Sequence, residues 1–287
     1  MKTTAMTATT TFETGVVRAS DGTRIGYRRI GSGPAVILVH GAMMTSKGFE
    51  TLATELSTEF TVYLPDRRGR GMSGPFGPGY GIRTEIDDIA VLLRETGAHN
   101  VFGLSAGATF ALHAARALPQ ITKLAVYDPP LADADGVSPL GWLDRYEHEM
   151  NYHRPASAFV TVAKGTGDTG SVIANIPRFL LTPLMAVMLR LDKGEDDEPL
   201  RNLLPTMRYD AGAVETVIND KDFGGLRCDT LLLGGEKSIG YLRTAQDTLE
   251  SLIPNARRVT LPGVGHLAAL NDEKPELVAA ELRSFFR

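Results

Sequence analysis

The sequence predicts an α/β fold: an eight-stranded, mostly parallel sheet with helices on both faces and a helical cap inserted after the sixth strand. Short β-branched runs alternate with longer helical patterns, as in parallel sheets whose strands are joined by crossover helices. A long stretch without a convincing β run, residues 131–223, separates the sixth run from the seventh. Of the 287 residues, 43% are hydrophobic and 22% are charged, which suits a packed globular protein.

Eight segments have the character of strands. They are Gly15–Arg18, Arg24–Arg28, Ala35–Val39, Phe60–Leu64, Asn100–Phe102, Lys123–Tyr127, Thr230–Leu233 and Arg257–Leu261. The first two surround the turn Asp21-Gly22, and the third is a continuous apolar run typical of a buried parallel strand. Strand segments therefore recur from near the N-terminus to near the end of the chain, with an interruption over residues 131–223.

Five helical patterns separate these strands. They are a helix from a cap at Ser46 to about Leu56, then Thr84–Thr96, Ala108–Leu118, Leu242–Leu252 and Pro275–Phe286. Residues 1–14, rich in Thr and Ala, are expected to be a loose tail. We therefore expect a core of residues 15–130 and 224–287, with residues 131–223 as the helical cap.

Composition excludes several classes of partner. The net charge is −4, without a basic stripe that would neutralise phosphates, so no nucleic-acid partner is expected. Cys228 is the only cysteine, which rules out an intrachain disulfide and suits the cytoplasm. No His/Cys cluster has the spacing of metal ligands, and no metal or cofactor is expected. The most apolar late stretch, residues 179–191, is too short to span a membrane. A monomer or homodimer acting on a small molecule is the simplest expectation.

Ser105 is the strongest candidate for a catalytic residue. It lies at the centre of Gly103-Leu104-Ser105-Ala106-Gly107, between a predicted strand and a predicted helix. A strand that turns sharply into a helix exposes such a serine, and the flanking glycines avoid crowding in the turn. The N-terminus of the following helix offers backbone N–H groups, the first from Ala106, to a developing oxyanion.

Four segments together resemble the α/β-hydrolase superfamily, from about Thr23 to the C-terminus except across the inserted helices. Besides the serine turn, these are the segments 39–42 (Val-His-Gly-Ala), 66–74 (Asp-Arg-Arg-Gly-Arg-Gly-Met-Ser-Gly) and Gly265-His266. The resemblance implies a serine nucleophile, an oxyanion hole formed by the N–H groups of Ala42 and Ala106, and His266 as the general base. The position of His266 in a glycine-rich loop after the last strand independently favours this role.

The remaining histidines fit a catalytic base less well. His40 precedes the oxyanion segment and is interpreted as structural, His113 lies within the helix after Ser105, and His99 lies in a surface turn. His148 and His153 belong to the cap, where a solvated or packed side chain is the simpler interpretation.

The carboxylate of the triad departs from the usual pattern. Many relatives carry an aspartate after the seventh strand, about three residues beyond a glycine, but this chain has Ser238 there. Some members of the superfamily take the acid from the end of the sixth strand, where this chain has Asp128 immediately before two prolines. By that resemblance Asp128 is the favoured acid, and Glu236 is the alternative. For Asp128 the competing interpretation is a turn carboxylate that caps nearby N–H groups.

The arginine-rich loop Arg67-Arg68-Gly69-Arg70 is interpreted as a structural turn near the floor of the active site rather than an anion site. Asp66 is expected to pair with the backbone or with a neighbouring arginine. Neither is assigned a contact with substrate.

The cap is expected to determine specificity, because loops at the carboxyl ends of parallel strands form the ligand crevice. Residues 179–189 form a dense apolar block, interpreted chiefly as the core of the cap. Candidate contacts to substrate are Met43, Leu104, Trp142, Met185, Met188 and Leu267, with Tyr146 and Tyr152 as further possible wall residues. A cap this apolar favours a hydrophobic substrate over a charged one.

These features predict a hydrolase that cleaves a carboxylic ester or lactone of a mainly apolar small molecule through an acyl-enzyme. A serine at the turn disfavours the branches of the superfamily that use a carboxylate nucleophile. Two alternatives remain on the same scaffold: a non-hydrolytic enzyme, such as a cofactor-free oxygenase, lyase or cyclase with His266 as its base, and a ligand receptor. Labelling of Ser105 by a covalent serine probe separates these hypotheses.

Overall fold

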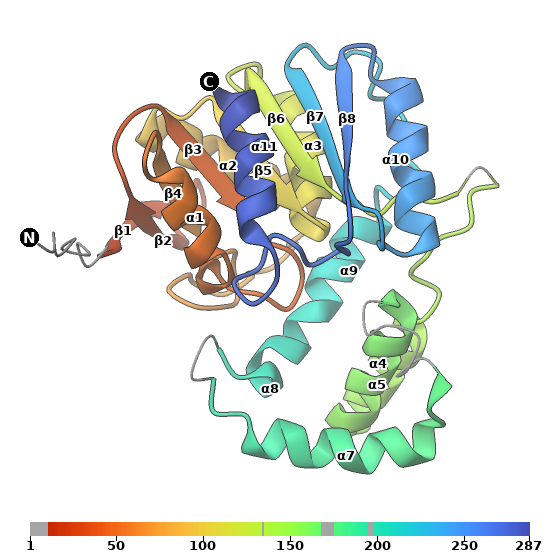
Figure 1. The fold of residues 1–287 in the computed structure, drawn as a ribbon. Helices are drawn as coiled ribbons and strands as arrows, with labels where there is room; N and C mark the ends of the chain where they lie inside the picture. Colours follow the sequence, from red (N-terminus) through yellow and green to blue (C-terminus); the bar gives the residue numbers. More distant parts are fainter. Residues whose placement is uncertain (1–10, 134, 168–174, 195–197) are drawn as a thin grey trace, which may run out of the picture.

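A computed structural model describes residues 11–133, 135–167, 175–194 and 198–287. Most of the residues predicted as a loose tail, 1–10, lie outside this range. The described chain has a central sheet flanked by helices, and a group of inserted helices lies beyond one end of the strands (Figure 1).

The sheet has eight strands in the order β1-β2-β4-β3-β5-β6-β7-β8. They are β1 (Glu13–Arg18), β2 (Arg24–Ile30), β3 (Ala35–Val39), β4 (Thr61–Pro65), β5 (Asn100–Leu104), β6 (Lys123–Tyr127), β7 (Asp229–Gly235) and β8 (Ala256–Leu261). Strand β2 pairs antiparallel with β1 and β4, and the pairs from β4 through β8 are parallel. The predicted fold class and all eight predicted strands are confirmed. Strand β1 begins two residues before the predicted start, because Glu13 and Thr14 already pair with β2.

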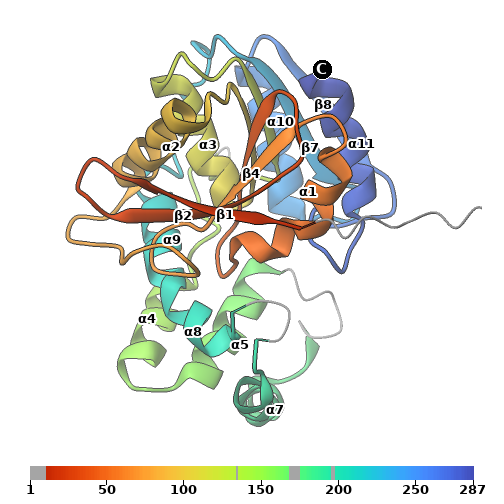
Figure 2. The same ribbon diagram turned by 90° about the vertical axis from the view of Figure 1, so that its left-hand side faces the viewer.

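Alternating side chains of the central strands pack on opposite faces of the sheet. In β3, Ile37 and Val39 join one buried apolar cluster while Val36 and Leu38 join the other. Helices α2 (Ile82–Thr96), α3 (Ala106–Ala117) and α10 (Gly240–Leu252) contribute to the first cluster. Helices α1 (Glu50–Leu56) and α11 (Pro275–Phe286) contribute to the second. Figure 2 shows α2 and α3 on one side of the sheet and α1 and α11 on the other.

The first crossover begins with a short 3₁₀ helix, η1 (Ser46–Phe49), that leads into α1. The predicted cap at Ser46 is wrong by one residue, since the hydroxyl of Thr45 accepts the hydrogen bond from the Lys47 N–H. Ser46 is instead buried, where its hydroxyl accepts a hydrogen bond from Arg28 and its N–H donates to Asp66. The serine therefore joins the first crossover to the loop after β4.

The inserted helices occur between β6 and β7 in the sequence. They are α4 (Leu143–Asn151), α5 (Pro155–Thr166), α7 (Arg178–Leu191), α8 (Leu200–Leu203), η2 (Leu204–Thr206) and α9 (Met207–Glu215). Buried Glu149 of α4 connects three of them: its carboxylate accepts hydrogen bonds from Thr161 of α5 at 2.5 Å and from Arg178 of α7 at 2.8 Å. We call this group of helices the insertion.

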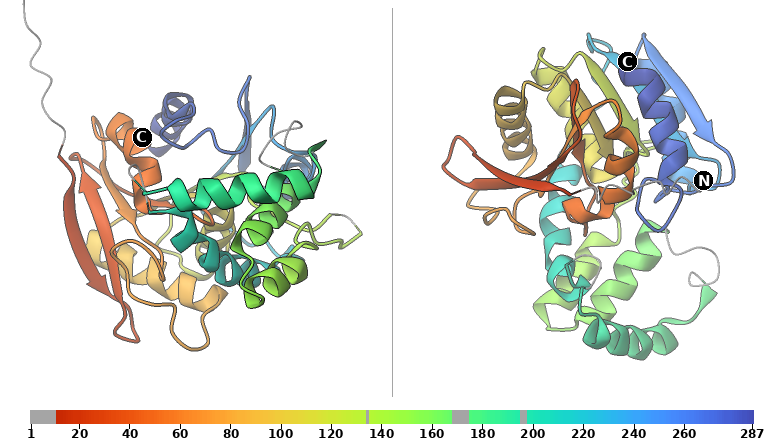
Figure 3. Two further views of the ribbon diagram at one scale, coloured as in Figure 1. Left: turned by 90° about the horizontal axis from the view of Figure 1, so that it is seen from below. Right: turned by 60° about the vertical axis from the view of Figure 1, so that its left-hand side comes forward.

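Helix α7 is not the core of the insertion, and that prediction is wrong for most of its apolar block. Leu181 and Leu189 are buried, but Phe179 is 75% exposed and Leu191 is 71% exposed. Among the described elements, α7 packs mainly against α5 and less extensively against α8, which leaves much of its surface uncovered. Figure 3 (left), seen from below, shows α7 in front of the other inserted helices. The small core of the insertion is formed by Tyr146, Ala158, Val162, Leu204, Met207 and Ala211.

Candidate active site

Ser105 occupies a strained turn between β5 and α3. Its backbone has φ 55° and ψ −123°, a conformation that non-glycine residues rarely adopt. A Cβ atom at Gly103 would lie 2.5 Å from the carbonyl oxygen of Gly107, and one at Gly107 would lie 2.3 Å from that of Val39. Both glycines are therefore required by the close approach of neighbouring backbone, and they allow the turn to present Ser105 at the N-terminus of α3.

Asp128 and His266 meet at the carboxyl end of the sheet. Nδ1 of His266 lies 3.3 Å from Oδ2 of Asp128, although the two residues are 138 positions apart. Asp128 is fully buried, and it follows β6 with a positive φ of 47° while its N–H donates to the carbonyl of Leu233 in β7. Its backbone is thus held at the point where the chain leaves the sheet, with the carboxylate directed toward the loop that carries His266.

Two polar side chains from the segment that follows β7 form hydrogen bonds with the Asp128 carboxylate. Ser238 donates from its hydroxyl to Oδ2 at 2.5 Å, and Gln246 of α10 donates to Oδ1 at 3.4 Å. Gly234 of β7 leaves room for this carboxylate, because a Cβ atom there would lie 2.6 Å from Oδ1. Sequence reasoning identified Ser238 only as the residue that replaces an acid, and it identified no role for Gln246 or Gly234.

The alternative acid, Glu236, lies in a different environment. It is exposed, and its carboxylate accepts a hydrogen bond from the N–H of Gly263 at 2.8 Å in the loop after β8. This contact connects the two loops that follow β7 and β8.

A cavity of about 50 Å³ opens beside Ser105. Its lining includes the predicted residues Ala42, Ser105, Ala106, Trp142 and His266. The indole Nε1 of Trp142 is buried and has no hydrogen-bond partner within the described part of the chain. Trp142 thus contributes to the wall of the cavity, and its N–H is, among these residues, an unpaired donor enclosed by protein.

Sequence reasoning missed most of the wall of this cavity. The missed residues are Pro130, Leu140, Thr166, Met207, Asp210, Ala211, Val214 and Tyr241. Four of them lie on α9 at positions i, i+3, i+4 and i+7 from Met207, the spacing of one helix face. This helical spacing in the last helix before β7 is the sequence pattern from which these four residues could have been predicted to share one face.

The other predicted pocket residues lie in varied places. Met43, with a φ of 54°, packs against the core of the insertion, and Leu104 is fully buried in the second core cluster. Met185 and Met188 are half-buried on α7, at the outer side of the insertion (Figure 1). Leu267, also half-buried, directly follows His266.

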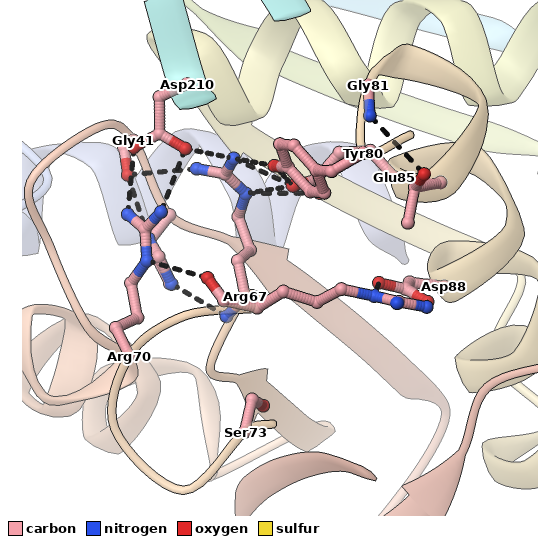
Figure 4. Close-up of polar contacts among 12 residues, drawn as sticks. Gly41, Arg67, Arg70, Ser73, Tyr80, Gly81, Glu85, Asp88 and Asp210 are labelled. Atoms are coloured by element: carbon pink, nitrogen blue, oxygen red, sulfur yellow. Dashed lines mark hydrogen bonds and ion pairs between the residues drawn. The ribbon is translucent and has the colours of Figure 1, made fainter. Parts of the chain in front are cut away.

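The loop after β4 forms a buried charge network with the insertion (Figure 4). Arg67 donates to Glu85 of α2 and to Asp210 of α9, at 2.8 and 2.6 Å, and Arg70 donates to both carboxylate oxygens of Asp210 at 2.9 Å. Burial disfavours the charge on Asp210, but the two guanidinium groups lower the pKa of its carboxyl below the usual value. The interpretation of this loop as a structural turn agrees with these contacts.

None of the remaining polar residues singled out in the sequence lines the cavity beside Ser105. Asp66 accepts hydrogen bonds from the N–H groups of Ser46 and Met72, as expected for a carboxylate that pairs with the backbone. His148 and His153 are exposed on the insertion. Over residues 11–133, 135–167, 175–194 and 198–287, no group of three or more His, Cys, Asp or Glu side chains could hold a metal ion. The described helices include none that is long and apolar enough to cross a membrane.

Comparison with known proteins identifies the family. The Alpha/beta hydrolase family matches residues 36–281. A 2-(acetamidomethylene)succinate hydrolase from Mesorhizobium japonicum is 26% identical over 91% of this chain and 91% of the relative. An alpha/beta hydrolase from Sphaerobacter thermophilus is 33% identical, with a TM-score of 0.77, over 95% of this chain and 100% of that structure. The enol-lactonase of Burkholderia xenovorans, at 19% identity, a TM-score of 0.67 and 95% and 99% coverage, shares the fold. The chain belongs to the alpha/beta hydrolase family.

Proposed function

We propose that this protein is a serine hydrolase that cleaves a carboxylic ester or lactone of a small, mainly apolar molecule, with Ser105, His266 and Asp128 as its catalytic triad. The observation that carries the proposal is the contact of His266 with a fully buried carboxylate, in the wall of the same cavity that Ser105 lines. A buried acid that holds one imidazole nitrogen leaves the other nitrogen to act as a base toward a serine hydroxyl.

The proposed reaction has two acyl-transfer steps. The Ser105 oxygen attacks the substrate carbonyl carbon while its proton passes to Nε2 of His266, and the N–H groups of Ala42 and Ala106 stabilise the oxyanion. Collapse of this intermediate breaks the bond to the alcohol oxygen, which takes the proton from His266. Water then attacks the acyl-enzyme while its proton passes to His266, and collapse of the second intermediate returns this proton to the Ser105 oxygen and releases the acid.

The lining of the cavity supports a compact, apolar acyl group. Leu140, Met207, Ala211 and Val214 offer hydrocarbon surface, and the carboxylate of Asp210 is occupied by two arginines. The free indole N–H of Trp142 adds one requirement, because a buried donor without a partner costs about 1–3 kcal/mol. We infer that the substrate carries an oxygen acceptor, such as a lactone ring oxygen or an alkoxy oxygen, that receives this hydrogen bond.

A substrate panel tests the reaction class. Short- and long-chain p-nitrophenyl esters and a set of lactones are compared with a matched acetamide, which is included because a relative is named for hydrolysis of an acetamido compound. We expect the highest kcat/KM with a short ester or lactone, and loss of turnover and of fluorophosphonate labelling in Ser105→Ala. Activity that survives Ser105→Ala would support a non-hydrolytic reaction with His266 as the base.

A second comparison tests the acid. Asp128→Asn is expected to lower kcat by about a thousandfold or more, as when the acid of such a triad loses its charge. Glu236→Gln serves as the matched control and is expected to keep kcat, because its carboxylate contacts the exposed loop at Gly263. The reverse result would assign the acid to the loop after β7.

A further inference from the structure

The peptide group that joins Gly41 to Ala42 receives two hydrogen bonds on its carbonyl oxygen. Nδ1 of His40 lies 2.9 Å from this oxygen, and Nη1 of Arg67 donates to it at 3.3 Å. The N–H at the other end of the same planar peptide group belongs to Ala42, the proposed oxyanion donor. Whatever holds the Gly41 carbonyl therefore also sets the direction of the Ala42 N–H.

The tautomer of His40 follows from its neighbours. The N–H of Arg67 donates to Nε2 at 3.1 Å, so Nε2 accepts and the ring proton resides on Nδ1, where it donates to Gly41. Burial lowers the pKa of His40 well below its usual value, and the charges of Arg67 and Arg70 lower it further. The Gly41 carbonyl oxygen thus accepts one hydrogen bond from the neutral imidazole of His40 and a second from the guanidinium of Arg67.

Carboxylates from two separate elements hold the guanidinium of Arg67. Glu85 comes from α2 of the core and Asp210 from α9 of the insertion, and both carboxylates lie within 2.8 Å of Nη2. Its centre also lies 4.5 Å from the centroid of the Phe110 ring. Burial opposes the charge, but Asp210 and Glu85 raise the pKa of Arg67 well above its usual value, so it stays protonated. Figure 4 shows the guanidinium of Arg67 with Asp210 on one side and Glu85 on the other.

We propose that Arg67 is a positioning residue for the oxyanion hole: it aligns and polarises the Gly41–Ala42 peptide, and Asp210 of the insertion fixes Arg67 in place. A cationic donor on the carbonyl withdraws electron density from the amide, which makes the Ala42 N–H a stronger donor, and hydrogen bonds in such chains reinforce one another. Because Asp210 lies on α9, the oxyanion hole is complete only when the insertion is docked. This inference rests on the proposed function.

The loop supplies its own control. Arg68 is also buried and also forms an ion pair, with Asp88 at 2.7 Å, and its guanidinium donates to Asp21, Thr23 and Asp88 rather than to Gly41. Arg67→Gln and Arg68→Gln each remove one buried guanidinium, but only the first removes a donor from the oxyanion peptide. In Arg67→Lys a single ammonium keeps the charge beside Asp210 and Glu85, but the forked donor that reaches Gly41 is lost.

The experiment measures kcat and KM with the best ester, and the Ki of a boronic acid that forms a tetrahedral adduct with Ser105. We expect Arg67→Gln and Arg67→Lys to lower kcat by about tenfold to a hundredfold, somewhat less than removal of an oxyanion donor itself. KM should stay within about twofold, and Ki should rise by the factor that kcat loses, because both report transition-state binding. Arg68→Gln should lower the melting temperature without changing kcat or Ki.

Several outcomes overturn the proposal. It fails if folded Arg67→Gln keeps the kcat and Ki of Arg68→Gln, or if kcat falls while boronate affinity is unchanged. If Arg67→Gln does not fold, Arg67→Lys decides by the same criteria. The Ser105→Ala variant separates this failure from failure of the proposed function. If Ser105→Ala keeps full activity, the serine mechanism itself is rejected. If Ser105→Ala is inactive but Arg67→Lys keeps its kcat and Ki, only the role of Arg67 is rejected.

Discussion

The proposed acid, Asp128, lies at the end of β6, whereas Ser238 occupies the position after β7 where related sequences are expected to carry an aspartate. The carboxylate stands at the end of β6, and the serine that replaces the usual acid donates its hydroxyl to Oδ2, the oxygen that contacts His266. Asp128 was predicted from the resemblance to those superfamily members that take their acid from the end of the sixth strand. The sequence could not predict the partners of Asp128, because Ser238 and Gln246 are more than 100 positions away and the contact depends on the parallel pairing of β6 with β7.

Gly234 provides a direct test of this carboxylate site. In Gly234→Ala the new methyl group would lie 2.6 Å from Oδ1 of Asp128, so the carboxylate must move away from its position beside His266. We expect kcat to fall by about tenfold to a hundredfold, because a displacement of about 1 Å in a catalytic group has such an effect. Gly240→Ala is the control, since a Cβ atom at that position meets no atom within 4 Å. Steady-state kinetics measure kcat, and thermal melts show whether each variant is folded. An unchanged kcat in folded Gly234→Ala would contradict the assignment of Asp128 as the acid.

Replacement of Trp142 is expected to change stability and activity in opposite directions. Trp142→Phe keeps an aromatic ring but removes a buried N–H that has no partner among the described residues, so the free energy of unfolding should stay the same or increase. With a substrate that supplies an acceptor, kcat/KM should fall by about tenfold, the usual value of one hydrogen bond. The two quantities are read from urea denaturation and from kinetics. A variant that loses stability and keeps kcat/KM would show that the indole serves packing alone.

Among the elements, α9 contributes most to the candidate site and was the hardest to identify. Its apolar positions line the cavity and its Asp210 enters the buried charge network, yet its sequence resembles any amphipathic surface helix. By contrast, the strands were predictable because a strand buried on both faces is a short, continuous apolar run. The spacing of Met207, Asp210, Ala211 and Val214 marks one face of α9, but the neighbour against which that face packs depends on long-range contacts that the local pattern does not reveal.

His113 of α3 gives a prediction for the pH dependence of stability. Burial lowers its pKa to about 4, with a further contribution from Arg116, whereas the unfolded chain has the ordinary value of 6.5. The lowered pKa contributes stability above pH 6.5, and this contribution is lost as the pH falls toward 4. It amounts to about 3 kcal/mol for a shift of this size. The ring faces Asp220, at 3.9 Å, and the edge of Phe223.

His113→Gln removes this titration and leaves the other groups in place. As the pH falls from 6.5 to 4, the unfolding free energy of the wild type should therefore decrease relative to that of the variant. Urea denaturation at a series of pH values measures this difference. The absolute stability of the variant is not diagnostic, because glutamine also loses packing against Phe223. A difference that stays constant across this range would contradict the buried, neutral state of His113.

Across the whole molecule, burial decreases from the centre of the sheet toward the insertion. Every residue of β5 is buried between β3 and β6, while β1 and β8 form the edges and α7 exposes most of its apolar side chains. Hydrogen exchange followed by mass spectrometry should find the slowest amides in peptides covering 100–104 and much faster exchange in those covering 178–191, because poorly packed elements open more easily. Equal protection of α7 and β5 would show that α7 is covered in solution.

The same contrast explains what the sequence could predict of the fold as a whole. The sheet, its flanking helices and the serine turn depend on local patterns, and their positions follow from the order of strands and crossovers. The apolar block of α7 has a composition as hydrophobic as that of a core helix, and its exposure could not be predicted because composition does not reveal on how many sides a helix has neighbours.

The place of Asp128 also bears on how this scaffold can be rebuilt. The proposed acid is the last residue before Pro129 and Pro130, after which the chain leaves the sheet, and α4 begins only at Leu143. Ser238 and His266 lie beyond the point where the chain returns to β7. A foreign insertion spliced in after Pro130 and before β7 would replace the part of the cavity wall that the insertion forms, while leaving all three proposed triad residues in the host. Such a chimera would, however, need its own carboxylate to satisfy Arg67 and Arg70.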